Sequence, residues 1–131
     1  MAAISHNGLK VWQKSMDLVE EVYILSRKFP REELYGVTSQ LRRAVVSIPA
    51  NIAEGNGRST RRDYAHFLKI AMGSAREVDT LLQVAVRIRI ARSEEITQLR
   101  NRVDEICRML HRLHCNLQPN VPSGNGQVPS R

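Results

Sequence analysis

Three side chains near the end of the chain have the types and spacing of metal ligands. Cys107, His111 and His114 follow one another at steps of four and three residues, which places them on one side of a helix. Thiolate and imidazole groups in this arrangement can chelate zinc. However, the paired ligand spacing of zinc modules is absent from the sequence, and Leu110 and Leu113 carry the apolar stripe beside the cluster. We therefore expect solvated or interfacial side chains here, with no metal and no other cofactor.

A second polar group consists of Asn51, Glu54 and Glu77. Asn51 and Glu54 lie three residues apart on the flank of one predicted helix, and Glu77 lies on the flank of the next. If these flanks face each other, the carboxylates are partly buried and need nearby arginines as partners. The group then forms either a binding pocket or a polar network that fixes helix register or a subunit interface. We favour the network, because buried polar groups must be paired whatever the function.

Arginine supplies most of the positive charge. The chain has 20 Lys and Arg against 13 Asp and Glu, a net charge of +7, and a basic surface favours nucleic acid or other anionic surfaces. The planar guanidinium fork suits phosphate, although a merely solvated charged surface is the alternative. The candidate phosphate contacts lie in the second predicted helix and around its turn into the third: Arg42, Arg43, Arg58, Arg61 and Arg62. Few aromatic residues lie among them, which argues against base stacking.

The sequence offers no catalytic constellation. The serines at 47, 59 and 74 each lack a histidine in a nucleophile motif. The turn at 55–58 is too short for a phosphate loop and follows a predicted helix rather than a strand. The Glu-x-x-His spacing of di-iron bundle proteins is also absent. We therefore expect a protein that is not an enzyme.

Four helical patterns position these residues. Apolar residues recur at steps of three and four over 10–28, 34–55, 60–90 and 93–117, which is typical of amphipathic helices. The second helix is expected to begin near 34–38 and to end near Gly55. Four such helices with short connections predict an all-α fold, an antiparallel up-down-up-down four-helix bundle. Length and composition predict one domain, with an N-terminal extension at 1–9, the bundle at 10–117 and a flexible C-terminal tail at 118–131.

Capping residues and glycines mark the helix ends. We expect Thr60 and Ser93 to cap the third and fourth helices. Gly55 and Gly57 are expected to supply the left-handed backbone that ends the second helix. Gly73, midway along the third helix, is expected to leave room for a neighbouring backbone.

Several features bear on location. No apolar run approaches the ~20 residues that span a bilayer, and the first residues contain no apolar signal core. Cys107 and Cys115 are eight residues apart in one helical pattern, too far for a disulfide. We expect free thiols and a cytoplasmic protein with no membrane partner.

Five segments together resemble a known family. They are LKVWQKSMDL at 9–18, the Phe-Pro stop at 29–30, ELYG at 33–36, QLRRAVVSIPANIAEGNGR at 40–58 and YAHFLKIAMGSAREVDTLL at 64–82. These segments resemble the four-helix-bundle proteins of the 23S ribosomal RNA intervening-sequence family, over about 9–117. The resemblance implies an antiparallel four-helix bundle that assembles as a ring-shaped homo-oligomer, a pentamer.

Two hypotheses about function follow. The first is a non-enzymatic oligomeric bundle that binds RNA or another nucleic acid through arginine–phosphate contacts. The alternative is a structural or protein-interaction scaffold that does not bind nucleic acid. Salt distinguishes them, because phosphate binding weakens steeply as salt rises, whereas assembly through apolar surfaces does not.

Overall fold

Helices make up almost all of the described part of the chain. The computed structural model describes residues 5–117 and contains no strand within that range. The four long helices are α1 (Lys10–Ser26), α2 (Ser39–Asn56), α3 (Arg61–Arg87) and α4 (Ser93–Asn116). The prediction of an all-α fold with four helices is confirmed. The predicted tail at 118–131 and the first four residues of the predicted extension lie outside the described residues.

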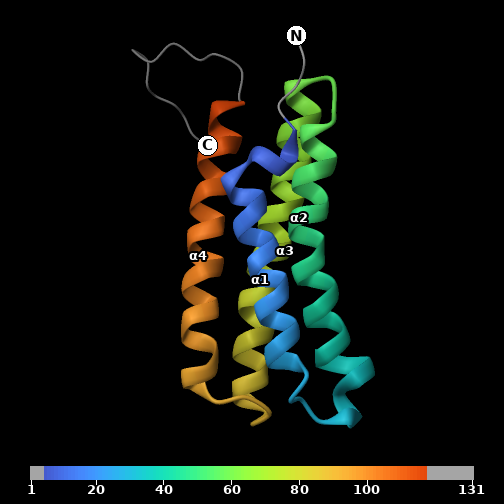
Figure 1. Ribbon diagram of the computed structural model, residues 1–131, viewed down its shortest axis with the longest axis vertical. Coiled ribbons are helices and arrows are strands. Elements are labelled where there is room, and N and C mark those ends of the chain that lie inside the picture. Colours follow the sequence, from blue (N-terminus) through green and yellow to red (C-terminus); the bar gives the residue numbers. More distant parts are fainter. Residues whose placement is uncertain (1–4, 118–131) are drawn as a thin grey trace.

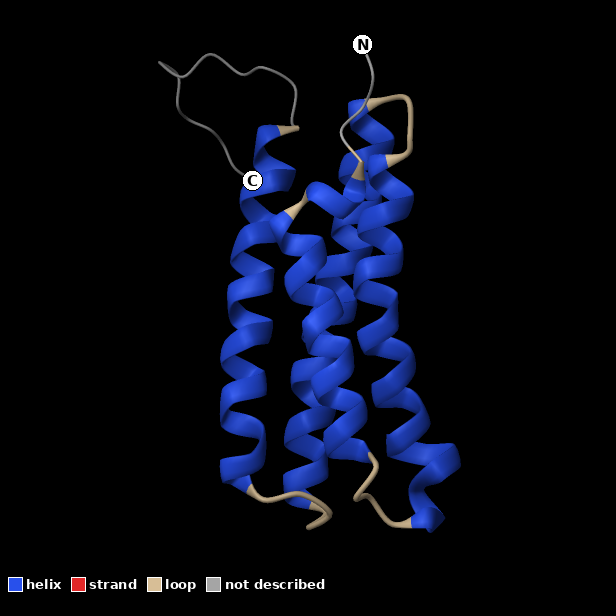
Figure 2. Cartoon of the chain, viewed as in Figure 1, coloured by secondary structure: helices blue, strands red, loops and turns tan. Residues whose placement is uncertain are grey.

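The four helices lie side by side along the longest dimension of the molecule (Figure 1). The connections from α1 to α2 and from α3 to α4 lie at one end, and the turn from α2 to α3 lies at the other. These connections are short in comparison with the helices (Figure 2). α2 packs against α1 and α3, and α4 packs against α3 and α1, so each helix has two main neighbours.

The predicted apolar stripes form one core. Its largest members are completely buried: Leu18, Leu41, Ile48, Ile52, Leu68, Leu82, Ile106 and Leu110. Burying a Leu or Ile side chain stabilises the fold by about 1.5–3 kcal/mol before the cost of ordering the chain. The core therefore provides the main stabilisation of the four helices, and the polar side chains discussed below lie at its margins.

A residue with non-helical backbone angles interrupts the helical turns that lead into α2. Two short helical turns, η2 (Arg31–Glu33) and η3 (Leu34–Thr38), connect α1 to α2. Gly36 within η3 has φ −114° and ψ −114°, which lies outside the helical region. The second helix therefore begins at Ser39, immediately after the range 34–38 in which its start is predicted.

The two predicted capping residues have different outcomes. Thr60 caps α3 as expected, since its Oγ1 accepts a hydrogen bond from the Asp63 N–H at 3.0 Å. The prediction for Ser93 is wrong, because Ser93 is already the first helical residue of α4 and Arg92 precedes it in extended backbone. The Arg92 N–H donates instead to Glu95 Oε1 at 2.8 Å. A hydrogen bond from Lys28, and then the one from the Arg92 N–H, lower the pKa of Glu95.

Among the described residues, the ion pairs that join distant parts of the chain all involve α4. They are Lys14–Glu105 at 3.4 Å, Lys28–Glu95 at 2.6 Å, Asp79–Arg100 at 2.7 Å and Glu21–Arg102 at 3.0 Å. The last is a close ion pair whose atoms are not aligned as a hydrogen bond. Within residues 5–117, no ion pair joins α1, α2 and α3 to one another. Charge therefore contributes to holding α4 more than any other helix.

The end of α3 has a glycine-type conformation without a glycine. α3 ends at Arg87 rather than near residue 90 as predicted, and Arg89 has a φ of 67°. The Ile90 N–H donates to the Ala85 carbonyl at 2.9 Å, and the Arg89 N–H donates to the Val86 carbonyl at 3.0 Å. These two bonds form a Schellman motif, in which glycine is the usual left-handed residue.

Replacing Arg89 by glycine is expected to raise the free energy of unfolding by about 1 kcal/mol, because glycine removes the left-handed strain of a residue with a Cβ. Chemical denaturation of wild type and variant measures the difference. Arg87→Gly is the matched control, and it should lower stability because Arg87 is the last residue of α3. A loss of stability in Arg89→Gly as well would show that the arginine side chain contributes more than the strain costs.

Candidate nucleic-acid interface

A groove between the beginning of α3 and the end of α4 gathers basic side chains. It has a volume of about 730 Å³. Its lining consists of Arg61, Arg62, Ala65, His66 and Lys69 from α3, with His114 and Leu117 from the end of α4. We call it the basic groove.

The helical repeat of α3 brings these side chains together. Arg62, His66 and Lys69 follow one another at steps of four and three residues and therefore share one face of the helix. The Thr60 cap fixes the start of α3, so that Arg61 and Arg62 occupy its first turn. The unpaired N–H groups of that turn give it a partial positive charge, which adds to the charge of the side chains.

No acidic side chain lies among the described residues that line the basic groove. Arg61, Arg62 and Lys69 are exposed, and none of them forms an ion pair with another described residue. Permanent charges of one sign around a concave surface attract anions and raise their local concentration. The basic groove is therefore suited to phosphate.

His114 adds a charge that depends on pH. Burial lowers its pKa, and the positive charges of Lys69 and His111 lower it further. An anion in the groove would oppose this effect by favouring the protonated ring.

Acidification is expected to destabilise the protein through His114. Its pKa is lower in the folded chain than the ordinary value of 6.5, so the unfolded chain takes up this proton first as the pH falls. The His114 contribution to stability is therefore lost from about pH 6.5 down to the lowered folded pKa, and it changes no further below that. Urea denaturation at a series of pH values measures the effect. The fall should be smaller in His114→Gln, and equal falls in the two proteins would contradict the assignment.

The structure divides the five predicted phosphate contacts between the two ends of α2. Arg42 and Arg43 lie near its beginning, whereas Arg58, Arg61 and Arg62 lie at and after its end. A helix rises about 1.5 Å per residue, so most of the length of α2 separates the two sets. They are too far apart to line one groove. Only Arg61 and Arg62 line the basic groove.

Two of the five arginines are already engaged within the protein. Arg42 Nε donates to Ser26 Oγ at 2.8 Å, and its guanidinium lies over the Tyr23 ring at 4.5 Å from the centroid. Arg58 pairs with Glu54 at 2.9 Å and lies over the Phe67 ring at 4.7 Å. These contacts give Arg42 and Arg58 a packing role at the boundary between helices.

The predicted polar group is also divided. Asn51 Nδ2 donates to the Ser47 carbonyl at 2.8 Å and lies 2.9 Å from Ser47 Oγ, which in turn is 2.8 Å from Ser74 Oγ. This network joins α2 to α3. Glu77 is exposed and forms no ion pair with a described residue, and Glu54 pairs with Arg58, which lies just beyond the end of α2. The structure thus places Asn51 with two serines and leaves both carboxylates at the surface.

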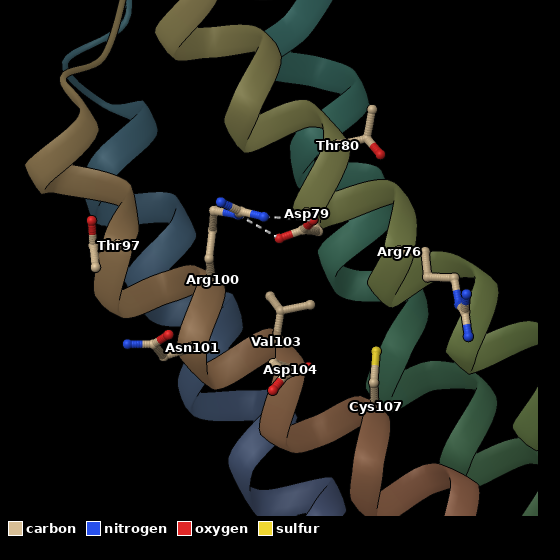
Figure 3. A pocket seen from close by; sticks show the side chains of 9 residues that line it. All are labelled: Arg76, Asp79, Thr80, Thr97, Arg100, Asn101, Val103, Asp104 and Cys107. Atoms are coloured by element: carbon tan, nitrogen blue, oxygen red, sulfur yellow. Dashed lines mark hydrogen bonds and ion pairs between the residues drawn. The ribbon is translucent and has the colours of Figure 1, made fainter.

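A second hollow, of about 570 Å³, lies farther along α3 and α4 (Figure 3). Arg100 extends from α4 to Asp79 of α3, with Nε 2.7 Å from Oδ1 and Nη2 3.3 Å from Oδ2. The bond and the charge of Asp79 raise the pKa of Arg100. Because this forked pair neutralises its own charge, the second hollow attracts phosphate less than the basic groove does.

The three candidate metal ligands lie in different surroundings. Cys107 lines the second hollow, His114 lines the basic groove, and His111 Nε2 is 3.6 Å from Cys115 Sγ. Burial raises the pKa of the Cys107 thiol, and the charge of Arg76 offsets this only in part. In the part of the chain that the structure describes, no group of three or more His, Cys, Asp or Glu side chains is placed to hold a metal ion.

The sequence of this chain matches a known protein family over most of its length. The family model described as 23S rRNA-intervening sequence protein matches residues 7–112, which is most of the chain. The chain belongs to this family. The resemblance found in the sequence motifs is therefore confirmed.

A solved structure supports the membership of the chain in this family. It is a protein of unknown function from the S23 ribosomal protein family of Bacteroides thetaiotaomicron. The two chains are 26% identical, the TM-score is 0.74, and the match covers 79% of this chain and 97% of the other. A comparison with curated proteins found no match. The similarity supports the fold and carries no activity with it.

Some residues of the basic groove are missing from the site that the sequence predicts. The predicted site contains Arg61 and Arg62 but neither His66 nor Lys69. The sequence contains the signal for His66 and Lys69, because they follow Arg62 at steps of four and three residues and therefore lie on the same helix face. His114 could be added only once the pairing of α3 with α4 was known.

Among the described helices, none combines the length and apolar character needed to cross a bilayer.

Proposed function

We propose that this protein is a non-enzymatic, cytoplasmic RNA-binding protein whose basic groove holds the phosphate backbone. One observation carries the proposal: three unpaired cations and two histidines from two helices line a single groove without an acid among its described residues. Contacts of this kind supply affinity that does not depend on sequence.

The lining also indicates which part of RNA the groove contacts. No Phe, Tyr or Trp lies among the described residues of the basic groove, so stacking on unpaired bases is not its mode of binding. Arg61 and Arg62 suit phosphate oxygens through forked hydrogen bonds. The groove therefore positions an RNA backbone rather than reading its bases.

The proposal includes assembly into a ring-shaped homo-oligomer, a pentamer of antiparallel four-helix bundles, as the motif resemblance implies. An apolar strip on α1 and α2 supports it. Met16, Ile24 and Val46 are 40%, 57% and 42% exposed. Ile24 and Val46 line a shallow hollow together with Val19 and Tyr23. A ring would repeat the basic groove around its axis and multiply the contacts with one RNA.

The test is binding of the purified protein to a structured bacterial RNA across a salt series, with the mass of the protein in solution determined. The logarithm of the binding constant should fall linearly with the logarithm of salt, with a slope of about −0.7 to −0.9 for each phosphate contacted. An oligomer that ignores RNA even at low salt would contradict the proposal. That result would favour the alternative, a scaffold that assembles through the apolar strip.

A further inference from the structure

A hollow at the other end of the molecule combines arginines with an exposed aromatic ring. It lies beside the connection between α1 and α2 and has a volume of about 680 Å³. Arg27, Arg31 and Arg42 line it, and no acidic side chain lies among its described lining residues. We call it the arginine hollow.

The three arginines are available to an anion to different degrees. Arg27 and Arg31 are exposed and form no ion pair with a described residue. Arg42 is held in place by Ser26 Oγ, which accepts from its Nε at 2.8 Å, and by the Tyr23 ring beneath it. The fork formed by the two terminal nitrogens of Arg42 takes no part in that bond. A guanidinium held in this way loses little freedom when it binds phosphate.

An unpaired hydroxyl group is a second, independent observation. Thr38 lines the same hollow and is only 4% exposed. Its Oγ1 is buried and has no hydrogen-bond partner among the described residues. A buried polar group without a partner costs about 1–3 kcal/mol, so a polar ligand seated in the hollow would relieve that cost.

The rim of the hollow carries an aromatic side chain. Tyr35 is 93% exposed, and it lines the hollow together with the three arginines. An exposed ring beside cations can stack on a nucleic-acid base. The basic groove has no such ring among its described residues.

We propose that the arginine hollow binds one nucleotide, with its phosphate held by Arg27, Arg31 and Arg42 and its base stacked on Tyr35. The ligand is either a free nucleoside monophosphate or an unpaired nucleotide of a single strand, which share this chemistry. The site is separate from the basic groove and does not depend on RNA binding there.

Calorimetric titration with adenosine 5′-monophosphate, inorganic phosphate and a short single-stranded oligonucleotide tests the proposal. Arg31→Ala should weaken all three ligands, whereas Tyr35→Ala should weaken the nucleotide and the oligonucleotide by about tenfold and spare phosphate. Both side chains are exposed, so the variants should fold. Arg87→Ala removes an exposed arginine that does not line the hollow, and it should change nothing.

The comparison of ligands identifies the source of the nucleotide. Equal affinity for the monophosphate and the oligonucleotide indicates a free nucleotide, and much tighter binding of the oligonucleotide indicates a strand. Binding should persist in Arg61→Ala/Arg62→Ala, which separates this site from the basic groove. Absence of binding at millimolar ligand, or affinities unchanged in both Arg31→Ala and Tyr35→Ala, would overturn the proposal. A change of mass in solution in Tyr35→Ala would overturn it too, by showing that the hollow is a contact between subunits.

Discussion

Replacing both Arg61 and Arg62 by alanine is expected to weaken RNA binding by about tenfold or more at low salt. Both side chains line the basic groove from the first turn of α3. Each phosphate contact that is lost should also make the salt dependence shallower by about one unit of slope. The measurement is the binding constant of wild type and variant for the same RNA over the same salt series.

A matched control removes the same charge elsewhere. Arg43 and Arg87 are exposed, form no ion pair with a described residue and lie outside the basic groove. Arg43→Ala/Arg87→Ala should therefore keep most of the affinity and of the salt slope. If the two double variants lose affinity equally, the overall charge rather than the groove binds RNA. Circular dichroism of each variant verifies that the helices remain intact.

Replacing Gly55 by alanine is expected to lower the free energy of unfolding by about 1–3 kcal/mol through overpacking. The new Cβ would lie 2.9 Å from Phe67 Cβ, 3.0 Å from Tyr64 Cδ1 and 3.2 Å from the Tyr64 carbonyl oxygen. One of these neighbours is main chain and cannot rotate away, so α2 and α3 would have to separate. Chemical denaturation measures the loss.

Gly73→Ala is the corresponding substitution without a neighbour. A Cβ at Gly73 meets nothing within 4 Å, and Gly73 lies in the interior of α3. Alanine should therefore stabilise the protein by about 1 kcal/mol, the ordinary helix preference of alanine over glycine. A gain of stability in both Gly55→Ala and Gly73→Ala would show that helix preference, and not the contact between α2 and α3, decides both.

The glycines also show why the apolar pattern predicts the helices better than it predicts the contacts between them. The sequence predicts close approach at Gly73 and left-handed backbone at Gly55 and Gly57. The structure places the close approach at Gly55 and the left-handed residue at Arg89, and neither Gly55 nor Gly57 has a positive φ. Periodicity says which face of a helix is apolar, but the closeness of two backbones depends on both helices at once.

For the candidate site too, the residues that share one helix could be predicted from the sequence, whereas the contact between two helices could not. The steps of four and three that join Arg62, His66 and Lys69 are local and can be found in the sequence. The addition of His114 depends on which turn of α4 lies beside the beginning of α3, and that register is set by the whole core. The sequence does not tell whether Arg42 and Arg61 share a face, because the distance between them depends on where α2 begins and ends.

The ion pairs of α4 have a consequence for how this helix moves. Exposed ion pairs are weakened by salt, and α4 is the helix that such pairs join to the rest of the described chain. Local opening becomes easier when an element loses contacts that hold it, so rising salt should speed amide hydrogen exchange in α4 more than in α2 and α3. The end of α4 also forms one wall of the basic groove. Salt would thus act on RNA binding twice, by screening the phosphates and by loosening the wall that encloses them.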